Sequence, residues 1–179
     1  DQTRPPVLIV HGLFGSGRNW GVIAKRLAKD RRVVTVDMRN HGDSPRADSQ
    51  SYPEMDSDLA EVVGEIGGRA DVIGHSMGGK AAMVLALTHP DCVNRLIVAD
   101  IAPVGYGHSQ SHLVEAMQGL DLAALDTRAD ADTALAATVE EKGVRAFLLQ
   151  SLDVRDKAWK LNLDVLGRDM DTVTGFPDV

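Results

Sequence analysis

The chain has 179 residues, of which 44% are hydrophobic and 25% charged, and its formal net charge is -7 at pH 7. This composition is ordinary for a globular domain that buries a substantial core. No run of lysine or arginine stands out, which argues against nucleic-acid and membrane partners, because both attract concentrated basic patches. The single cysteine, Cys92, cannot form an internal disulfide, and no segment reaches the ~18 apolar residues of a membrane span. We therefore expect a cytoplasmic protein, and no ligand spacing indicates a metal or another cofactor.

Strand-like and helix-like segments alternate over the first hundred residues. Four short runs rich in β-branched residues are apolar on both faces, as in a buried parallel sheet: residues 7–10, 33–36, 71–74 and 96–99. Between them, apolar residues recur at helical spacing in residues 19–28, 52–66 and 77–88. Asn19 is the expected N-cap of the first helix, and Pro53 suits the first turn of the second. Repeated strand–helix units predict the α/β fold class, with a mostly parallel sheet flanked by helices.

The pattern changes after about Ser109. Apolar residues continue at helical spacing in three groups, near residues 113–120, 134–139 and 144–148, and no further strand is expected before Val179. We therefore expect residues 1–108 to form a core that carries the sheet, and residues 109–179 to form a helical cap.

Gly74-His75-Ser76-Met77-Gly78 matches the G-x-S-x-G pattern of a nucleophile elbow. The pattern needs small residues two positions before and after the serine, because the strand-to-helix turn is too tight for side chains there. Such a turn exposes the serine hydroxyl at the N-terminus of the next helix, where negative charge is favoured. Here the pattern follows an apolar strand and opens a helix of small residues, so we expect Ser76 to be a nucleophile.

A glycine-containing loop, His11-Gly12-Leu13-Phe14-Gly15, follows the first predicted strand. Its amides can point at an incoming carbonyl oxygen, and we expect the N–H groups of Leu13 and Met77 to form an oxyanion hole. The alternative is an ordinary glycine turn.

Four segments together resemble the α/β-hydrolase fold family, and within it the bacterial small esterases with HGLFGS and GHSMGG motifs: residues 11–16, 37–45, 74–80 and 100–103. The resemblance implies a Ser–Asp/Glu–His triad, a two-amide oxyanion hole and a helical cap. It assigns Ser76 as nucleophile. For the acid it offers two positions: Asp100, after the sixth strand, or a residue after the seventh strand, beyond Val179. Asp100 could instead only cap the turn before Pro103. The resemblance also implies that Asp37 is a structural turn residue.

None of the six histidines matches the position of the family's catalytic base. His11 is expected to brace its loop, and the side chain of His75 to leave the elbow away from the nucleophile. The others are expected at structural or solvated positions: His41, His89, His108 and His112. His108 and His112 would share one face if both were helical. The resemblance places the base beyond Val179, and it equates the four strands with the family's third to sixth. The strand at residues 96–99 would then have an open flank, which a second chain or segment would complete.

The sequence therefore predicts a serine carboxylesterase that hydrolyses small acyl esters or thioesters through an acyl-enzyme on Ser76. Phe14, Phe147, Leu148 and Trp159 would line the acyl pocket, unless they pack as plain core. Two alternatives remain. One is another reaction of the same site, by a thioesterase, lactonase, C–C hydrolase or cofactor-free haloperoxidase. The other is a non-catalytic relative that binds a ligand or partner.

Overall fold

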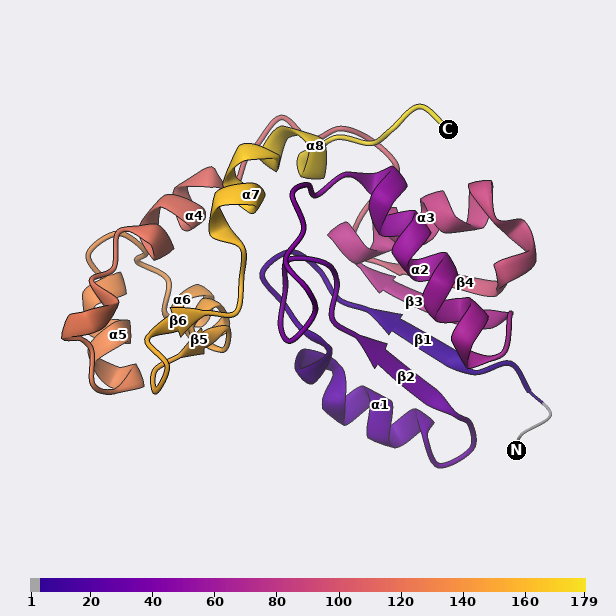
Figure 1. Cartoon of the computed structure of the whole chain (residues 1–179), viewed down its shortest axis with the longest axis horizontal. Coiled ribbons are helices and arrows are strands. Elements are labelled where there is room, and N and C mark those ends of the chain that lie inside the picture. The colour runs from indigo at the N-terminus through magenta and orange to yellow at the C-terminus, as the bar shows by residue number, and fades with distance from the viewer. Residues whose placement is uncertain (1–3) are drawn as a thin grey trace.

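A four-stranded parallel sheet forms the centre of the computed structural model, which describes residues 4–179 (Figure 1). The strand order is β2-β1-β3-β4, and the strands are β1 (Val7–Val10), β2 (Val33–Val36), β3 (Ala70–His75) and β4 (Val93–Ala99). All four predicted strands are confirmed, and the last two are longer than the sequence indicated. Every residue of β1 is buried, as its apolar sequence predicts for a central strand covered on both faces.

Helices cover both faces of this sheet (Figure 1). The elements are η1 (Gly17–Trp20), α1 (Gly21–Leu27), α2 (Tyr52–Ile66), α3 (Met77–Thr88) and the short η2 (Pro90–Cys92). The predicted bounds of α2 and α3 are confirmed. The prediction for Asn19 is wrong: it lies inside η1, and its side-chain oxygen accepts the N–H of Ser16 at 2.7 Å. A 3-10 turn that starts at Ser16 displaces the start of α1 to Gly21.

The cap lies beyond the carboxyl ends of the strands (Figure 1). It contains α4 (Ser111–Gln118), η3 (Leu122–Ala124), α5 (Arg128–Leu135), α6 (Lys142–Leu149), β5 (Leu152–Asp153), β6 (Ala158–Trp159) and α7 (Leu163–Arg168). The expectation of no further strand is wrong, because β5 and β6 pair as an antiparallel hairpin. Each strand has only two residues, which is too short to give a period-2 pattern.

The chain returns to the sheet at its last helix, α8 (Met170–Thr174). Val173 belongs to the hydrophobic cluster that packs on the sheet, and the hydroxyl of Tyr52 donates to its carbonyl at 2.6 Å. The ammonium of Lys80 donates to the carbonyls of Thr174 and Gly175 at 2.8 and 2.6 Å. The division into a core of residues 1–108 and a cap of residues 109–179 stays a prediction. Residues 173–175, at the end of the predicted cap, contact the core.

Two hydrophobic clusters make up the interior. One packs between the sheet and helices α2 and α3, and the other fills the cap. Leu13 packs against both clusters, and Phe14, which follows β1, belongs to the cap cluster. The loop after β1 is therefore the place where the two cores meet.

The outer edge of β4 is open in the part of the chain that the structure describes, since no strand between residues 4 and 179 pairs with it. Ile97 in this strand is 57% exposed, whereas Leu8 in β1 is fully buried. The expected open flank is thus present in the described residues. None of the helices within residues 4–179 is both long enough and apolar enough to cross a bilayer.

The start of α3 passes directly over the end of β1. A Cβ atom on Gly78 would lie 2.3 Å from the carbonyl oxygen of His11 and 2.6 Å from that of Val10. These contacts involve backbone on both sides, so no side chain can move aside to make room. The close approach of α3 to β1 therefore requires glycine at position 78.

Gly78→Ala should destabilise the fold by about 3 kcal/mol, the upper end of overpacking costs, because only backbone movement can relieve the clash. Gly64→Ala is the matched control. Gly64 lies in α2 with nothing within 4 Å of an added Cβ, so alanine there should stabilise by about 0.5–1 kcal/mol. Urea unfolding followed by circular dichroism measures both. Wild-type stability in Gly78→Ala would contradict the packing argument.

Candidate active site

Ser76 occupies the turn between β3 and α3. Its backbone lies at φ 51° and ψ -122°, a strained conformation for a residue with a side chain. Its N–H donates to the carbonyl of Ala99 at 3.1 Å, which fixes the turn to the neighbouring strand β4. Gly74 and Gly78 flank it at the predicted spacing, and a Cβ on Gly74 would lie 2.5 Å from the carbonyl oxygen of Gly78. The predicted elbow is present.

The loop after β1 approaches this elbow closely. A Cβ on Gly12 would lie 3.0 Å from the Cβ of Ser76 and 2.9 Å from Nδ1 of His75. Glycine at position 12 therefore lets the backbone of residues 11–15 lie against the serine turn.

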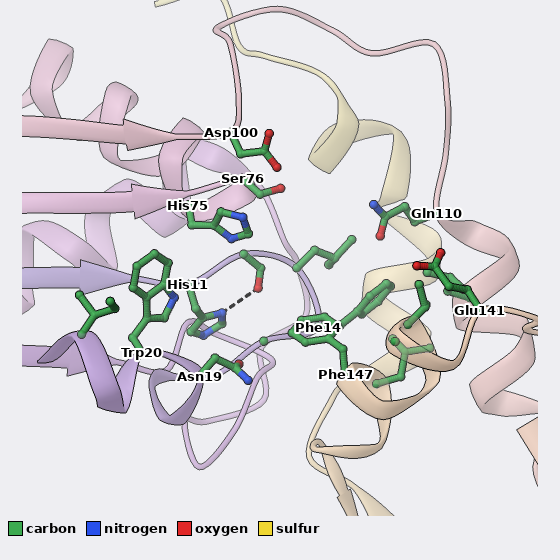
Figure 2. Close-up of a pocket in the computed structure, with 18 residues that line it drawn as sticks. His11, Phe14, Asn19, Trp20, His75, Ser76, Asp100, Gln110, Glu141 and Phe147 are labelled. Atoms are coloured by element: carbon green, nitrogen blue, oxygen red, sulfur yellow. Dashed lines mark hydrogen bonds between the residues drawn. The ribbon is translucent and has the colours of Figure 1, made fainter. Parts of the chain in front are cut away.

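Two cavities meet at Ser76, and Figure 2 shows the residues that line the first. The first has a volume of about 630 Å³ and the second about 550 Å³, and four residues line both: Leu13, Ser76, Asp100 and Gln110. The wall of the first is largely apolar, from Phe14, Trp20, Ile23, Leu113, Val144, Phe147 and Leu148. The second has several polar side chains in its wall: Lys80, Tyr106, His108 and Gln110. Ser76 therefore stands where an apolar chamber and a more polar one join.

Asp100 follows β4 and lies beside Ser76 (Figure 2). The parallel register pairs His75 with Ala99, so the residues that follow both strands are neighbours at the same edge of the sheet. Asp100 is exposed and has φ 59°, the left-handed conformation that Ser76 also adopts. The structure thus brings together the two side chains predicted as nucleophile and acid.

The amides of Leu13 and Met77 have no protein acceptor among residues 4–179. Met77 is the first residue of α3, where a helix leaves N–H groups unsatisfied. The direction of the Leu13 amide follows from its peptide plane, because the C=O and N–H of a trans peptide point in opposite directions. The carbonyl of Gly12, in the same plane, accepts from Nδ1 of His11 at 2.8 Å and from the Gly15 N–H at 3.0 Å. The Leu13 N–H therefore points away from these donors.

Two buried histidines hold this loop. Nε2 of His11 accepts the N–H of Met38 at 2.9 Å, and Nε2 of His41 accepts the N–H of Phe14 at 3.1 Å. Each ring therefore carries its proton on Nδ1, which donates to Gly12 O in His11 and to Arg39 O, at 2.8 Å, in His41. Burial lowers the pKa of both, that of His41 to about 3, so both rings are neutral at pH 7. The predicted bracing role of His11 and structural role of His41 are confirmed.

The sequence profile of the α/β-hydrolase fold family matches residues 5–174. The chain belongs to this family. It is 43% identical over 188 residues to the sn-1-specific diacylglycerol lipase ABHD11 of Mus musculus, covering 99% of this chain and 61% of the mouse protein. It is 38% identical to the esterase YbfF of Escherichia coli strain K12, covering 97% and 68%.

A solved structure of a marine microorganism esterase superposes on the hydrolase-fold chain with a TM-score of 0.92 at 37% identity. The match covers 98% of this chain and 71% of the esterase. The chain spans about three fifths of the length of the diacylglycerol lipases named ABHD11 that it matches, from mouse, zebrafish (Danio rerio) and Xenopus laevis.

Other predicted site residues have mixed outcomes in this hydrolase fold. Phe14, Phe147 and Leu148 line the first cavity as expected. Trp159 does not: it is 8% exposed within the cap cluster, and its indole N–H donates to the carbonyl of Met117 at 3.2 Å. Asp37 is confirmed as a turn residue, because its carboxylate accepts the N–H groups of Gly17 and Asp43.

Three further histidines lie near the cavities or in the cap. His75 lines the same cavity as Ser76, and its ring packs on Trp20 with centroids 5.9 Å apart. His108 precedes α4 and cannot share a helix face with His112. Among residues 4–179, no histidine is hydrogen-bonded to Ser76.

Sequence reasoning missed Lys80 and Ser151. Lys80 is 1% exposed in α3, and burial lowers its pKa. Its signal was a lysine in an otherwise small and apolar helix, where a buried ammonium needs acceptors. Ser151 follows α6 in the cap, and its hydroxyl donates to the carbonyl of Phe14 at 3.0 Å. The two residues are 137 positions apart, and no local pattern indicated the contact.

The neutral His41 makes stability depend on pH. Its pKa is about 3 in the fold and near 6.5 when unfolded, so between these values only the unfolded chain takes up the proton. Falling pH therefore costs up to about 1.4 kcal/mol of stability per pH unit at this residue. His41→Gln should destabilise the fold most at pH 7, and its stability difference from wild type should shrink as the pH falls to 4.

Urea unfolding of both proteins at pH 7, 6, 5 and 4 measures this difference. His112→Gln, at an exposed position in the cap, is the control and should leave the pH dependence unchanged. A His41→Gln difference that stays constant over the range would contradict a buried neutral imidazole.

Proposed function

We propose that this protein is a serine carboxylesterase that hydrolyses esters of small acyl groups through an acyl-enzyme on Ser76. One observation carries the proposal: Ser76 stands on a strained turn, beside two cavities and next to two amides without protein acceptors. The names of the mouse lipase and the E. coli esterase support an ester substrate.

In the proposed reaction, the Ser76 oxygen forms a bond to the ester carbonyl carbon while a base takes its proton. The carbonyl oxygen becomes an oxyanion held by the amides of Leu13 and Met77, each worth about 3–4 kcal/mol of barrier. The carbon–oxygen bond to the alcohol then breaks, and the base returns the proton to the departing alkoxide. Water then attacks the acyl-enzyme carbonyl while the base takes a proton from it. The bond between the acyl carbon and the Ser76 oxygen breaks, and the base returns the proton to Ser76.

The base in this proposal is a histidine that lies outside residues 1–179 and is oriented by Asp100. Two facts support this assignment. Within residues 4–179 no imidazole is hydrogen-bonded to Ser76, and the ABHD11 relatives are longer than the chain. The Asp100 carboxylate would hold the imidazole in the correct tautomer and stabilise its charged form.

The apolar cavity favours the acyl chain of the substrate. Phe14, Phe147 and Leu148 offer it apolar surface, although Asp100 and Glu141 also line this cavity. The second cavity, with Tyr106 and His108 in its wall, suits the alcohol or thiol side of the substrate. A thioester substrate is the second candidate, because the same nucleophile and oxyanion hole act on both carbonyls.

We further propose a cytoplasmic location and a small-molecule substrate, without nucleic-acid or membrane partners, and a second chain or segment that pairs with the open edge of β4. The free cysteine supports the cytoplasmic location, and the acidic net charge supports the absence of nucleic-acid and membrane partners. The exposed side chain of Ile97 supports a second chain or segment on β4.

Ser76→Ala in the protein at its natural length should lower the hydrolysis of p-nitrophenyl esters by about 10⁶-fold and leave the fold intact, because no other group takes over the attack. Fluorophosphonate should label the wild type and not the variant. Ser57→Ala, at an exposed serine whose hydroxyl bonds only to the helix carbonyl of Pro53, is the control. Ester hydrolysis that survives in Ser76→Ala would refute the function.

Asp100→Asn should lower kcat by about 10⁴-fold with KM nearly constant, because an amide favours the wrong imidazole tautomer. Asp37→Asn is the matched control: Asp37 also follows a strand, yet its carboxylate bonds to backbone amides, so that variant should lose stability and keep kcat. Steady-state kinetics and thermal unfolding separate the two effects. Equal kcat in Asp100→Asn and wild type would remove Asp100 from the site.

A further inference from the structure

In the loop after β1, residues 11–15, three successive peptide units each have their own hydrogen bonds. The unit between Gly12 and Leu13 is fixed by two donors on Gly12 O, from His11 and Gly15. The next unit is fixed by the Phe14 N–H on His41. The third is fixed at both ends, because Gly15 N–H bonds back to Gly12 O and Ser151 donates to Phe14 O.

These holding groups come from different parts of the molecule. His11 and Gly15 belong to the loop itself, and His41 belongs to the loop after β2. Ser151 alone comes from the cap, where it follows α6 and precedes β5. It is 6% exposed, so water does not readily replace its hydroxyl on Phe14 O.

Phe14 is held by the cap in a second way. Its ring is 1% exposed and belongs to the cap cluster, and Figure 2 shows it beside Phe147 of α6. Its backbone has φ 65°, which a bulky residue adopts only when its surroundings enforce it. The strained conformation of Phe14 therefore depends on contacts that the cap supplies.

We propose that Ser151 is a positioning residue that couples the cap to the oxyanion hole. By holding the carbonyl of Phe14, it keeps the backbone of Phe14 in its left-handed conformation and thereby keeps the preceding amide, that of Leu13, aimed at the developing oxyanion. The cap thus tunes the chemical step as well as enclosing the substrate. The inference rests on the proposed function, since it assigns Leu13 to the oxyanion hole.

Ser151→Ala removes the one hydroxyl and no other atom. In the protein at its natural length, kcat for a p-nitrophenyl ester should fall about tenfold, less than the 10²–10³ that deleting an oxyanion donor costs, because the Leu13 amide remains but is less fixed. KM should stay within about twofold, since the interaction acts in the transition state. A trifluoromethyl ketone, whose adduct with Ser76 places an oxyanion on the same amides, should bind about tenfold more weakly for the same reason.

Two variants distinguish positioning from a merely structural role. Ser151→Thr keeps the hydroxyl and should recover most of kcat and of the ketone's affinity. Thr138→Ala also removes a cap hydroxyl that bonds to a backbone carbonyl, that of Leu135 at 3.3 Å, and Thr138 lines neither cavity at Ser76. This variant should leave kcat and the affinity for the inhibitor unchanged. Thermal unfolding of each variant reports the structural loss separately.

Wild-type kcat and ketone affinity in Ser151→Ala would overturn the coupling, and so would equal losses in Thr138→Ala. If Ser151→Ala does not fold, Ser151→Cys keeps the size and donates weakly, and its kcat should lie between wild type and a tenfold loss; wild-type kcat there would overturn the proposal too. Hydrolysis that survives in Ser76→Ala would instead refute the proposed function, so the two failures are distinguishable.

Discussion

The close approach of two backbones determines the rest of this structure. The end of β1 lies against Gly78 at the start of α3, and Gly12 in the following loop lies against His75 and Ser76, at distances too short for an added Cβ on either glycine. This crossing sets Leu13 beside Ser76 and gives both access to the same cavities. The contacts at Gly78 are between main-chain atoms, so they do not depend on which side chains form the cap and the cavity walls.

Neutral imidazoles suit the task of holding the loop after β1. A buried ring offers one acceptor and one donor, so it joins two backbone groups without bringing a charge near the serine. His11 and His41 do this side by side, with ring centroids 5.1 Å apart. Protonation of either would remove an acceptor and place a cation in the core, so the burial that lowers their pKa also preserves the loop.

The sheet and the elbow were predictable because their signals are local. Each strand is a short apolar run, and the glycines around Ser76 stand at fixed offsets within five residues. The errors came from contacts that no local pattern encodes. Asn19 lost its predicted N-cap position to a turn that starts at Ser16. Trp159 satisfies its N–H inside the cap and so leaves the pocket.

Strained backbone conformations are concentrated at the carboxyl edge of the sheet, with one such residue after each strand. Five non-glycine residues between positions 4 and 179 have positive φ, and four of them follow the four sheet strands in turn: Phe14, Asn40, Ser76 and Asp100. Asparagine tolerates this conformation, but the others cost about 1–3 kcal/mol each. Such strain persists only where the surroundings enforce it, and hydrogen bonds to other parts of the fold hold three of these four residues. Ser76 is tied to Ala99 in β4, and Asn40 to the backbone of Ala47 and Ser49. Phe14 is tied to His41 and to Ser151 of the cap. The edge that carries the proposed chemistry is therefore the least relaxed part of the sheet, and the cap is one of the elements that keep it so.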